Sequence, residues 1–277
     1  MWRDGEAVLG IDAAWTDGEP SGIALLRRRG DMWKCLRAAP SYAAFCRPSF
    51  DWLDSVTGAP VDTGAVLDTC RDLLGGAIPA VIAVDMPLAS TPVICRREAD
   101  NLVSRLFGRC KCAVHSPSPA RPGATGRRLH DGFSNKGYAL ATSLGCRVPA
   151  LLEVYPHVAL LGLTGRSERL PYKAGKSTTY WPGVPADTRK ARLLGEWASI
   201  LSALGQFISH ANLPLPEDPE KATFGYLKRF EDALDGLVCA WVATQYLEES
   251  ALPLGDDTAA IWVPISSMKC AGNAYAT

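Results

Sequence analysis

The run Ala80–Val84 constrains the fold more than any other segment, because all of its residues are apolar and most are β-branched. A strand that is apolar at every position belongs in the middle of a sheet whose two faces are both covered, as parallel sheets usually are. The run ends at Asp85-Met86-Pro87. It predicts an α/β fold with helices on both faces of the sheet.

Three short runs near the start of the chain predict three more strands. Ala7–Asp12 is apolar and ends in an acid, and Gly22–Leu26 and Met32–Ala38 follow it after polar turns. Short runs separated by Gly and Asp are typical of strands joined by hairpins. Pro149–Val154 predicts a later, parallel strand. We therefore expect a mixed five-stranded sheet, with three antiparallel N-terminal strands followed by parallel strands.

Several segments have the spacing of helices, and the last of them is the longest. The expected helices are Tyr42–Leu53, Gly64–Leu74, Glu98–Phe107, Val158–Leu163, Thr188–Ser209 and Phe224–Glu249. Leu170–Pro185 has no regular pattern, and Ala259–Ile265 predicts a short closing strand. We expect all elements to form a single domain over residues 1–277.

The composition is that of an ordinary globular protein, with 47% hydrophobic and 21% charged residues. No apolar run approaches the roughly 20 residues that a membrane span requires. The nine cysteines have no regular spacing, and no secretory segment is evident at the start. We therefore expect free thiols, a cytoplasmic location and no membrane partner. No haem or nucleotide cofactor is evident, and the oligomeric state is not predicted.

The zero net charge conceals a basic segment, Thr91–Arg147, which has ten Lys and Arg against three Asp and Glu. It predicts a basic insertion at about 91–147 with a flexible loop at Ser116–Gly126. Nucleic acid is a possible partner, because such cations bind phosphates without reading sequence. The alternative is an insertion that pairs with the acidic remainder of the chain. The candidate phosphate contacts are Arg96, Arg97, Arg105, Arg109, Lys111, Arg127, Arg128 and Lys136.

Five acids lie where a folded chain would bury them. Asp12 and Asp85 end predicted strands, Glu153 is inside one, and Asp232 and Asp235 share a face of the last helix. Carboxyl ends of parallel strands meet at one edge of a sheet, where ligands bind. Buried carboxylates need a partner, and Mg²⁺ or Mn²⁺ would supply one. Two such ions can clamp a phosphodiester during hydrolysis.

Each of these residues also has a purely structural interpretation. A strand-end Asp is often a turn former, and Glu153 has an arginine partner as its alternative. Lys228 has the spacing to pair with Asp232 on the helix. His157 is a possible general base near Glu153, with a core histidine as the alternative.

Two further motifs resemble binding sites. Cys110-x-Cys112 with His115 invites a zinc interpretation, but the spacing is not that of common zinc modules and no fourth ligand is evident. Gly175–Thr178 resembles a phosphate loop, but Leu170 stands where that motif has its first glycine.

Five short motifs follow one another in an order and spacing that resemble the predicted RNase H-like nuclease family catalogued as domain of unknown function 429. They are Gly10–Asp12, Val84–Pro87, Arg96–Asp100, Glu153–His157 and Glu231–Asp235. The resemblance covers about Leu9 to Pro264. It implies an RNase H-like fold related to RuvC-type resolvases. One departure is Ala13–Thr16, where the family often has Gly- and Trp-rich sequence.

The resemblance also implies a function and a set of residues. The implied metal ligands are Asp12, Asp85, Asp232 and Asp235, with Glu153 as a further catalytic residue and Mg²⁺ or Mn²⁺ as the cofactor. We therefore expect a metal-dependent nuclease that acts on DNA or RNA. Two alternatives stay open, which are an inactive nucleic-acid or protein binding module and a small-molecule phosphoryl-transfer enzyme on the same fold.

Overall fold

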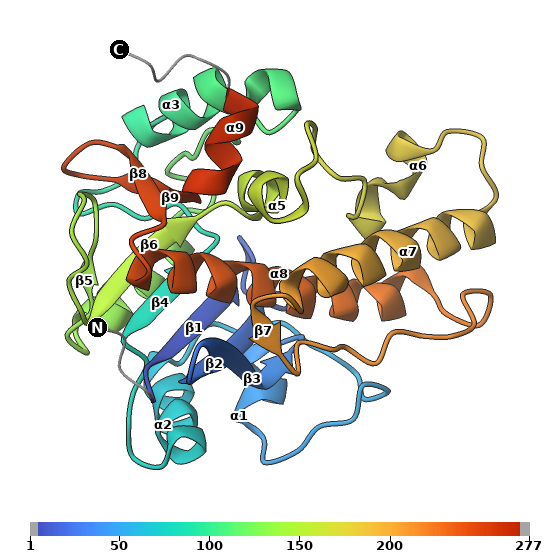
Figure 1. The fold of residues 1–277 in the computed structure, drawn as a ribbon, viewed down its shortest axis with the longest axis horizontal. Helices are drawn as coiled ribbons and strands as arrows, with labels where there is room; N and C mark the ends of the chain where they lie inside the picture. The colour runs from blue at the N-terminus through green and yellow to red at the C-terminus, as the bar shows by residue number, and fades with distance from the viewer. Residues whose placement is uncertain (1–4, 272–277) are drawn as a thin grey trace.

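The computed structural model describes residues 5–271, and its strands form one sheet (Figure 1). The strands are β1 (Ala7–Asp12), β2 (Gly22–Arg29), β3 (Met32–Ala39), β4 (Val81–Val84), β5 (Ala139–Leu140), β6 (Ala150–Val154), β7 (Ile208–Ser209), β8 (Ala251–Gly255) and β9 (Ala260–Pro264). The helices are α1 (Tyr42–Cys46), α2 (Thr63–Leu74), α3 (Glu98–Phe107), α4 (Ala124–Ser134), α5 (Pro156–Thr164), α6 (Ser177–Tyr180), α7 (Ala186–Leu204), α8 (Phe224–Leu247) and α9 (Met268–Ala271). Short 3₁₀ turns are η1 (Gly108–Cys110), η2 (Ala174–Lys176) and η3 (Ile265–Ser267).

The sheet has the mixed α/β, RNase H-like arrangement that the sequence predicts. Its centre has the order β3-β2-β1-β4-β6, in which β1 to β3 are antiparallel neighbours and β4 and β6 are parallel to β1. The expected number of five strands is too low, because nine occur among the described residues. Two of the additional strands, β5 and β7, have two residues each, which is too short for an alternating pattern. Strand β8 carries Pro253, which is tolerated at its edge position.

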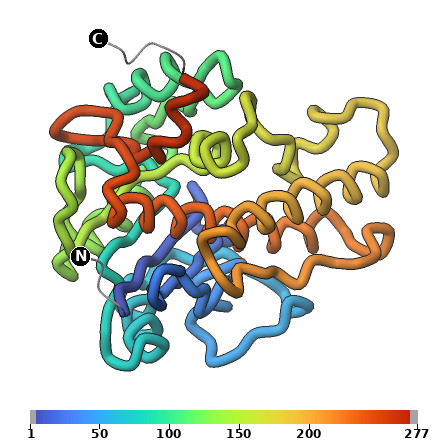
Figure 2. Tube along the Cα trace, in the orientation of Figure 1, coloured from blue at the N-terminus to red at the C-terminus, as the bar shows by residue number. Residues whose placement is uncertain are grey.

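Helices cover both faces of the sheet, and alternate residues of each strand point to opposite faces. In β1, Val8 packs in the cluster formed with α7 and α8, whereas Leu9 and Ile11 pack with α1, α2 and α4. Helices α7 and α8 lie side by side across the first of these faces (Figures 1 and 2). The run Ala80–Val84 is therefore apolar at every position because helices cover both faces of β4.

Helix α8 lies against β1 and β2 without any side chain between the backbones at three glycines. A Cβ added at Gly10 would lie 2.1 Å from the backbone nitrogen of Ala240, and one at Gly22 would lie 1.7 Å from the carbonyl oxygen of Asp232. On the helix itself, a Cβ at Gly236 would lie 2.8 Å from the nitrogen of Ile23. Only glycine permits such a close approach. These contacts fix the position of α8 over the end of β1.

The segment 91–147 connects β4 to β6 and packs against two separate parts of the core. Helix α3 packs with α5, α9 and β9, whereas α4 packs with α2 and the opposite face of the central strands. The chain between α3 and α4 therefore passes over the edge at which β4 and β6 end. The expected loop over Ser116–Gly126 extends to Gly123, where α4 begins.

Two of the expected helices end several residues earlier than the sequence predicts. The expected helix Thr188–Ser209 ends at Leu204, and Ile208–Ser209 forms β7 instead. The expected helix Tyr42–Leu53 ends at Cys46, because Arg47 is extended in front of Pro48. Leu170–Pro185 is largely irregular, as expected, with short turns at η2 and α6. No helix within residues 5–271 is both long enough and apolar enough to cross a bilayer. A single domain over 1–277 stays a prediction, since its ends lie outside the described residues.

Candidate active site

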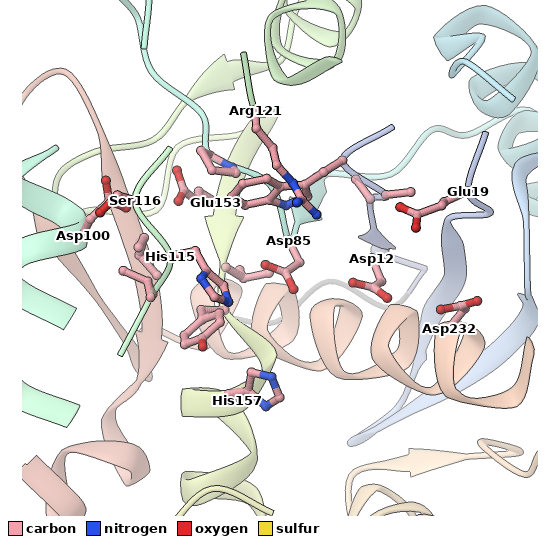
Figure 3. A pocket seen from close by; sticks show the side chains of 18 of the residues that line it. Asp12, Glu19, Asp85, Asp100, His115, Ser116, Arg121, Glu153, His157 and Asp232 are labelled. Atoms are coloured by element: carbon pink, nitrogen blue, oxygen red, sulfur yellow. The ribbon is translucent and has the colours of Figure 1, made fainter. Parts of the chain in front are cut away.

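Asp12 and Asp85 lie at the same edge of the sheet and face the same side. Asp12 is two residues beyond Gly10 on the α8 face, and Asp85 is two residues beyond Ala83, which packs in the α8 cluster. The backbone nitrogen of Asp85 donates to the carbonyl oxygen of Ile11 at 2.8 Å, which holds the two strand ends together. Both carboxylates line a cavity of about 700 Å³ (Figure 3).

Helix α8 brings two more acids beneath this edge, and they have different surroundings. Asp232 lines the cavity, with one carboxylate oxygen paired to Lys228 and with Oδ2 buried and without a hydrogen bond. Asp235 has no exposed surface, and both of its oxygens have partners. Tyr172 donates its hydroxyl to Oδ1 at 2.7 Å, and the ammonium group of Lys173 binds Oδ2. Asp232 therefore retains a free oxygen, and Asp235 does not.

The carboxyl groups of Asp85, Asp232 and Asp235 all have raised pKa values, so each resists ionisation. Burial is the main cause of the raised pKa of each, and the negative charge of Asp12 adds to it. The pKa of Asp85 lies well above its ordinary value, although Lys173 opposes the change. The pKa of Asp232 rises to about 8 despite Lys228, and that of Asp235 to about 7 despite Lys173. Carboxyl groups with raised pKa values in one cavity are typical of functional sites.

Lys173 and Glu231 complete a buried charge network that the sequence did not reveal. Burial lowers the pKa of Lys173, but Asp235 and its neighbours raise it well above its ordinary value. Glu231 accepts a hydrogen bond from the backbone nitrogen of Ala174 and forms ion pairs with Lys173 and Lys228. Lys173 lies in a stretch with no regular pattern, so no spacing in the sequence pointed to it.

Glu153 also lines this cavity (Figure 3), but it points to the other face of the sheet and belongs to a different ion-pair group. It is paired in register with Val84 of β4, and thus points away from the side that Asp85 faces. Arg97 binds both of its oxygens, at 2.6 and 2.7 Å, and also binds Asp100 at 2.7 Å. The arginine partner that the sequence left as an alternative for Glu153 is present. Strand alternation predicts the opposite face for Glu153, yet its side chain borders the same cavity, and its charge adds to the raised pKa of Asp85.

His157 is buried and lies at one end of the cavity (Figure 3). Burial, followed by the charge of Arg169, lowers its pKa well below the ordinary value. Its Nε2 is 2.5 Å from Nη2 of Arg169 and accepts a hydrogen bond from that group, and its Nδ1 is buried without a partner. The ring is thus neutral with one nitrogen engaged, and its role as a general base stays a prediction.

Most of the cations expected to contact nucleic acid bind the protein itself. Arg97 is buried against Glu153, and Arg96 donates to Asn101, Ser104 and Ser116 and to nearby carbonyl oxygens. The others with partners are Arg109 with the carbonyl oxygen of Cys270, Lys111 with Glu168, Arg127 with Asp131 and Arg128 with Asp17. Arg105 and Lys136 are exposed. The self-paired alternative therefore describes much of this segment.

A different set of basic side chains lines the cavity. These are His115 and Arg121 from the chain between α3 and α4, Arg169 from the chain after α5, and Lys228 from α8. Arg121 also lies over the ring of Trp15, 5.7 Å from its centroid. Neither Arg121 nor Arg169 stood out in the sequence, because loop geometry rather than spacing brings them to the cavity.

The possible zinc ligands are not brought together. Cys110 and Cys112 are buried, and the Cys112 thiol contacts the carbonyl oxygens of Cys110 and His157, whereas His115 lines the cavity. Within residues 5–271, no three His, Cys, Asp or Glu side chains lie close enough to hold a metal ion as they stand. A cation would therefore have to draw its ligands together.

The donor set nevertheless suits a hard cation at one place. Asp12, Asp85 and Asp232 supply carboxylate oxygens to one cavity, and the buried Oδ2 of Asp232 lacks a partner. Oxygen ligands of this kind are those that Mg²⁺ and Mn²⁺ prefer. Asp235 does not fit as a fourth ligand, because Lys173 and Tyr172 occupy its oxygens.

Comparison with known families gives one match. The sequence profile described as "Protein of unknown function (DUF429)" matches residues 10–260, which is most of the chain. No curated protein and no solved structure matches this chain. The match includes the strand ends and the helix that bear the aspartates. The chain therefore belongs to the DUF429 family.

Proposed function

We propose that the protein is a divalent-metal-dependent phosphodiesterase of the RNase H-like type, acting on DNA or RNA. One observation carries the proposal. Asp12, Asp85 and Asp232 come from β1, the end of β4 and α8, and they line a single cavity. Three acids from distant parts of the chain repel one another there, and a divalent cation would relieve that repulsion.

The acids and the lysines around them would have different roles in such a site. Asp12, Asp85 and Asp232 would hold Mg²⁺ or Mn²⁺, which supplies an activated water and stabilises negative charge on the reacting phosphate. Lys173 neutralises Asp235 and keeps it from binding the metal. The site therefore takes one cation, rather than the two that the sequence predicts. Lys228 holds Asp232 and balances its charge when no cation is bound.

The surroundings supply donors for a substrate at this site. His115 and Arg121 belong to the chain that passes over the sheet edge, and with Asp85 they line the same cavity (Figure 3). Their donors would bind substrate oxygens and orient the phosphate toward Asp12 and Asp85. The nine cysteines are free thiols, which supports the expected cytoplasmic location.

The test combines metal binding with cleavage. Calorimetric titration with Mn²⁺ should give one site per chain, and Asp12→Asn should abolish it. Cleavage of single-stranded and branched DNA and RNA should require the metal and fall more than about 100-fold in Asp12→Asn. Asp68→Asn is the matched control, because Asp68 pairs with Arg71 on the surface of α2.

Two results would contradict the proposal. The first is no cleavage of any of these substrates by the folded protein with Mn²⁺. The second is cleavage that is unchanged in Asp12→Asn. Nucleic-acid binding without cleavage or carboxylate-dependent metal uptake would instead favour the binding-module alternative.

A further inference from the structure

Arg169 differs from the other buried or partly buried cations around the cavity in having no acidic partner. Arg97, Lys173 and Lys228 each bind one or more carboxylates. Arg169 lines the cavity, yet no ion pair joins it to an acid in the described part of the chain. Its Nη2 donates to His157, and its Nε is buried without a hydrogen-bond partner.

The two groups that contact Arg169, the His157 ring and the Tyr180 hydroxyl, are both neutral, so neither balances its charge. His157 accepts with Nε2, so the ring is neutral, and the low pKa caused by burial and by Arg169 keeps it neutral. Lys176 is a second cation here. Burial lowers its pKa, and the positive charge of Arg169 lowers it further, which shows that the two cations act on each other. A cation held in place by a neutral ring, with a donor still unpaired, is the complement of an anion.

A second donor lies at the same end of the cavity. His115 also lines the cavity (Figure 3), and it is close enough to His157 to contribute to the lowered pKa of that ring. Tyr155 lies against His157, with ring centroids 5.3 Å apart, and the charges of Arg169 and Asp85 both act on it. This end of the cavity is therefore near the carboxylates but has the opposite charge.

We propose that Arg169 and His115 form a phosphate subsite, and that the substrate is a compact phosphodiester, such as the end of a strand, whose terminal phosphate binds there. This assignment rests on the proposed function, because the subsite would bind one phosphate of the substrate while the carboxylate site acts on a neighbouring bond. A guanidinium matches the geometry of phosphate oxygens and binds two of them at once. His115 would donate a further hydrogen bond from its ring.

Two features favour a compact substrate over continuous duplex. A cavity of about 700 Å³ lies within the usual range for small-molecule sites. Duplex binding instead needs cations along the backbone, and Arg96, Arg97, Arg127 and Arg128 bind the protein itself. A terminal phosphate occurs on a mononucleotide and on the end of a strand, and both have the chemistry that the subsite recognises.

The experiment measures binding before any reaction. Inorganic phosphate and a nucleoside 5′-monophosphate are titrated calorimetrically into the full chain, first with EDTA and then with Mg²⁺. Arg169→Gln should weaken binding about tenfold or more, the size expected for losing one charge-assisted contact. Arg169→Lys should keep much of the affinity, because the charge remains. Arg166→Gln is the matched control three residues away, since Arg166 pairs with Glu196 on the surface.

A second arm identifies the source of the phosphate. A short oligonucleotide is compared with and without a 5′-phosphate. Stronger binding of the phosphorylated strand, lost in Arg169→Gln, assigns the subsite to strand ends. Binding of the mononucleotide alone, lost in Arg169→Gln, assigns it to small molecules.

The outcomes separate this proposal from the proposed function. No binding of phosphate or nucleotide in either buffer overturns the subsite, as does equal weakening by Arg166→Gln or unchanged affinity in folded Arg169→Gln. Arg169-dependent phosphate binding in a protein that neither binds Mn²⁺ nor cleaves anything would uphold the subsite and defeat the phosphodiesterase. Circular dichroism confirms that each variant is folded.

Discussion

Helix α8 and the segment 91–147 are both expected from the sequence to build the site, and the structure uses them differently. Close backbone contacts with β1 and β2 hold α8 in place, and they fix the positions of the acids that α8 bears. The segment 91–147 instead uses most of its candidate arginines to bind the protein. The basic side chains that it brings to the cavity, His115 and Arg121, come from the chain between α3 and α4. Acids placed by a packed core are predictable from sequence, and cations placed by a loop are not.

The largest effect should come from breaking the contact that places α8. Gly22→Ala would put a Cβ 1.7 Å from the Asp232 carbonyl oxygen, which is backbone and cannot move alone. We expect the free energy of unfolding to fall by more than about 4–5 kcal/mol, or no folded protein. Urea denaturation measures it.

Gly195→Ala is the control for this change. Gly195 lies within α7 with nothing within 4 Å of its added Cβ, so the substitution should stabilise by about 0.5–1 kcal/mol. If Gly22→Ala left the unfolding free energy unchanged, the close approach of α8 would not be what positions the acids.

The next largest effect concerns the segment 91–147, which is held to the core through Arg97. Arg97→Met should cost about 3–5 kcal/mol, because it leaves Glu153 and Asp100 buried without a partner. Arg128→Gln, in the same segment but paired with Asp17 at the surface, should cost less than about 1 kcal/mol. Thermal or urea unfolding of both variants provides the measurement. Similar losses would mean that the segment is held uniformly rather than through Arg97.

The smallest effect concerns the pH dependence of the α8 acids. The folded-state pKa of Asp232 is about 8 and its ordinary value is 3.8, so the folded state binds more protons between these pH values. The free energy of unfolding should therefore fall as pH rises from about 4 to about 8. Asp232→Asn should reduce the fall in unfolding free energy between these pH values by at least about 1 kcal/mol. A tenfold difference in proton affinity between the folded and unfolded states corresponds to about 1.4 kcal/mol.

The measurement is urea unfolding of metal-free protein at several pH values. Asp68→Asn should retain the full dependence, because Asp68 is exposed on α2. A profile for Asp232→Asn that parallels the wild type would place the titration elsewhere. If the proposed metal site is correct, Mn²⁺ should stabilise the wild type more at pH 8 than at pH 5, since it competes with protons for the carboxylates.

The sequence predicted the central sheet well because its strands are long and strongly patterned. Ala7–Asp12 and Glu98–Phe107 have the predicted bounds, and the two-sided burial of β4 follows from its uniformly apolar residues. Strands β5 and β7 were missed, because two residues carry no pattern. They depend on tertiary contacts that propensity does not record.

The candidate site was predictable in part. Asp12, Asp85 and Asp232 line one cavity. The parallel pairing of β1 and β4 explains the positions of Asp12 and Asp85, and the close packing of α8 on β1 and β2 explains that of Asp232. Lys173 and Arg169 were not predicted, since each acts through a partner more than ten residues away in sequence. A lysine that binds a buried aspartate has no local signature, and only the fold brings the two together.

The pairing of Lys173 with Asp235 and of Lys228 with Asp232 has a consequence for how the protein is made. Many small metalloproteins remain unfolded until their ion arrives. This chain carries its own counterions, so the acids can be buried during synthesis without one. Folding would then be independent of the proposed cation, which the protein could take up or lose while keeping its structure.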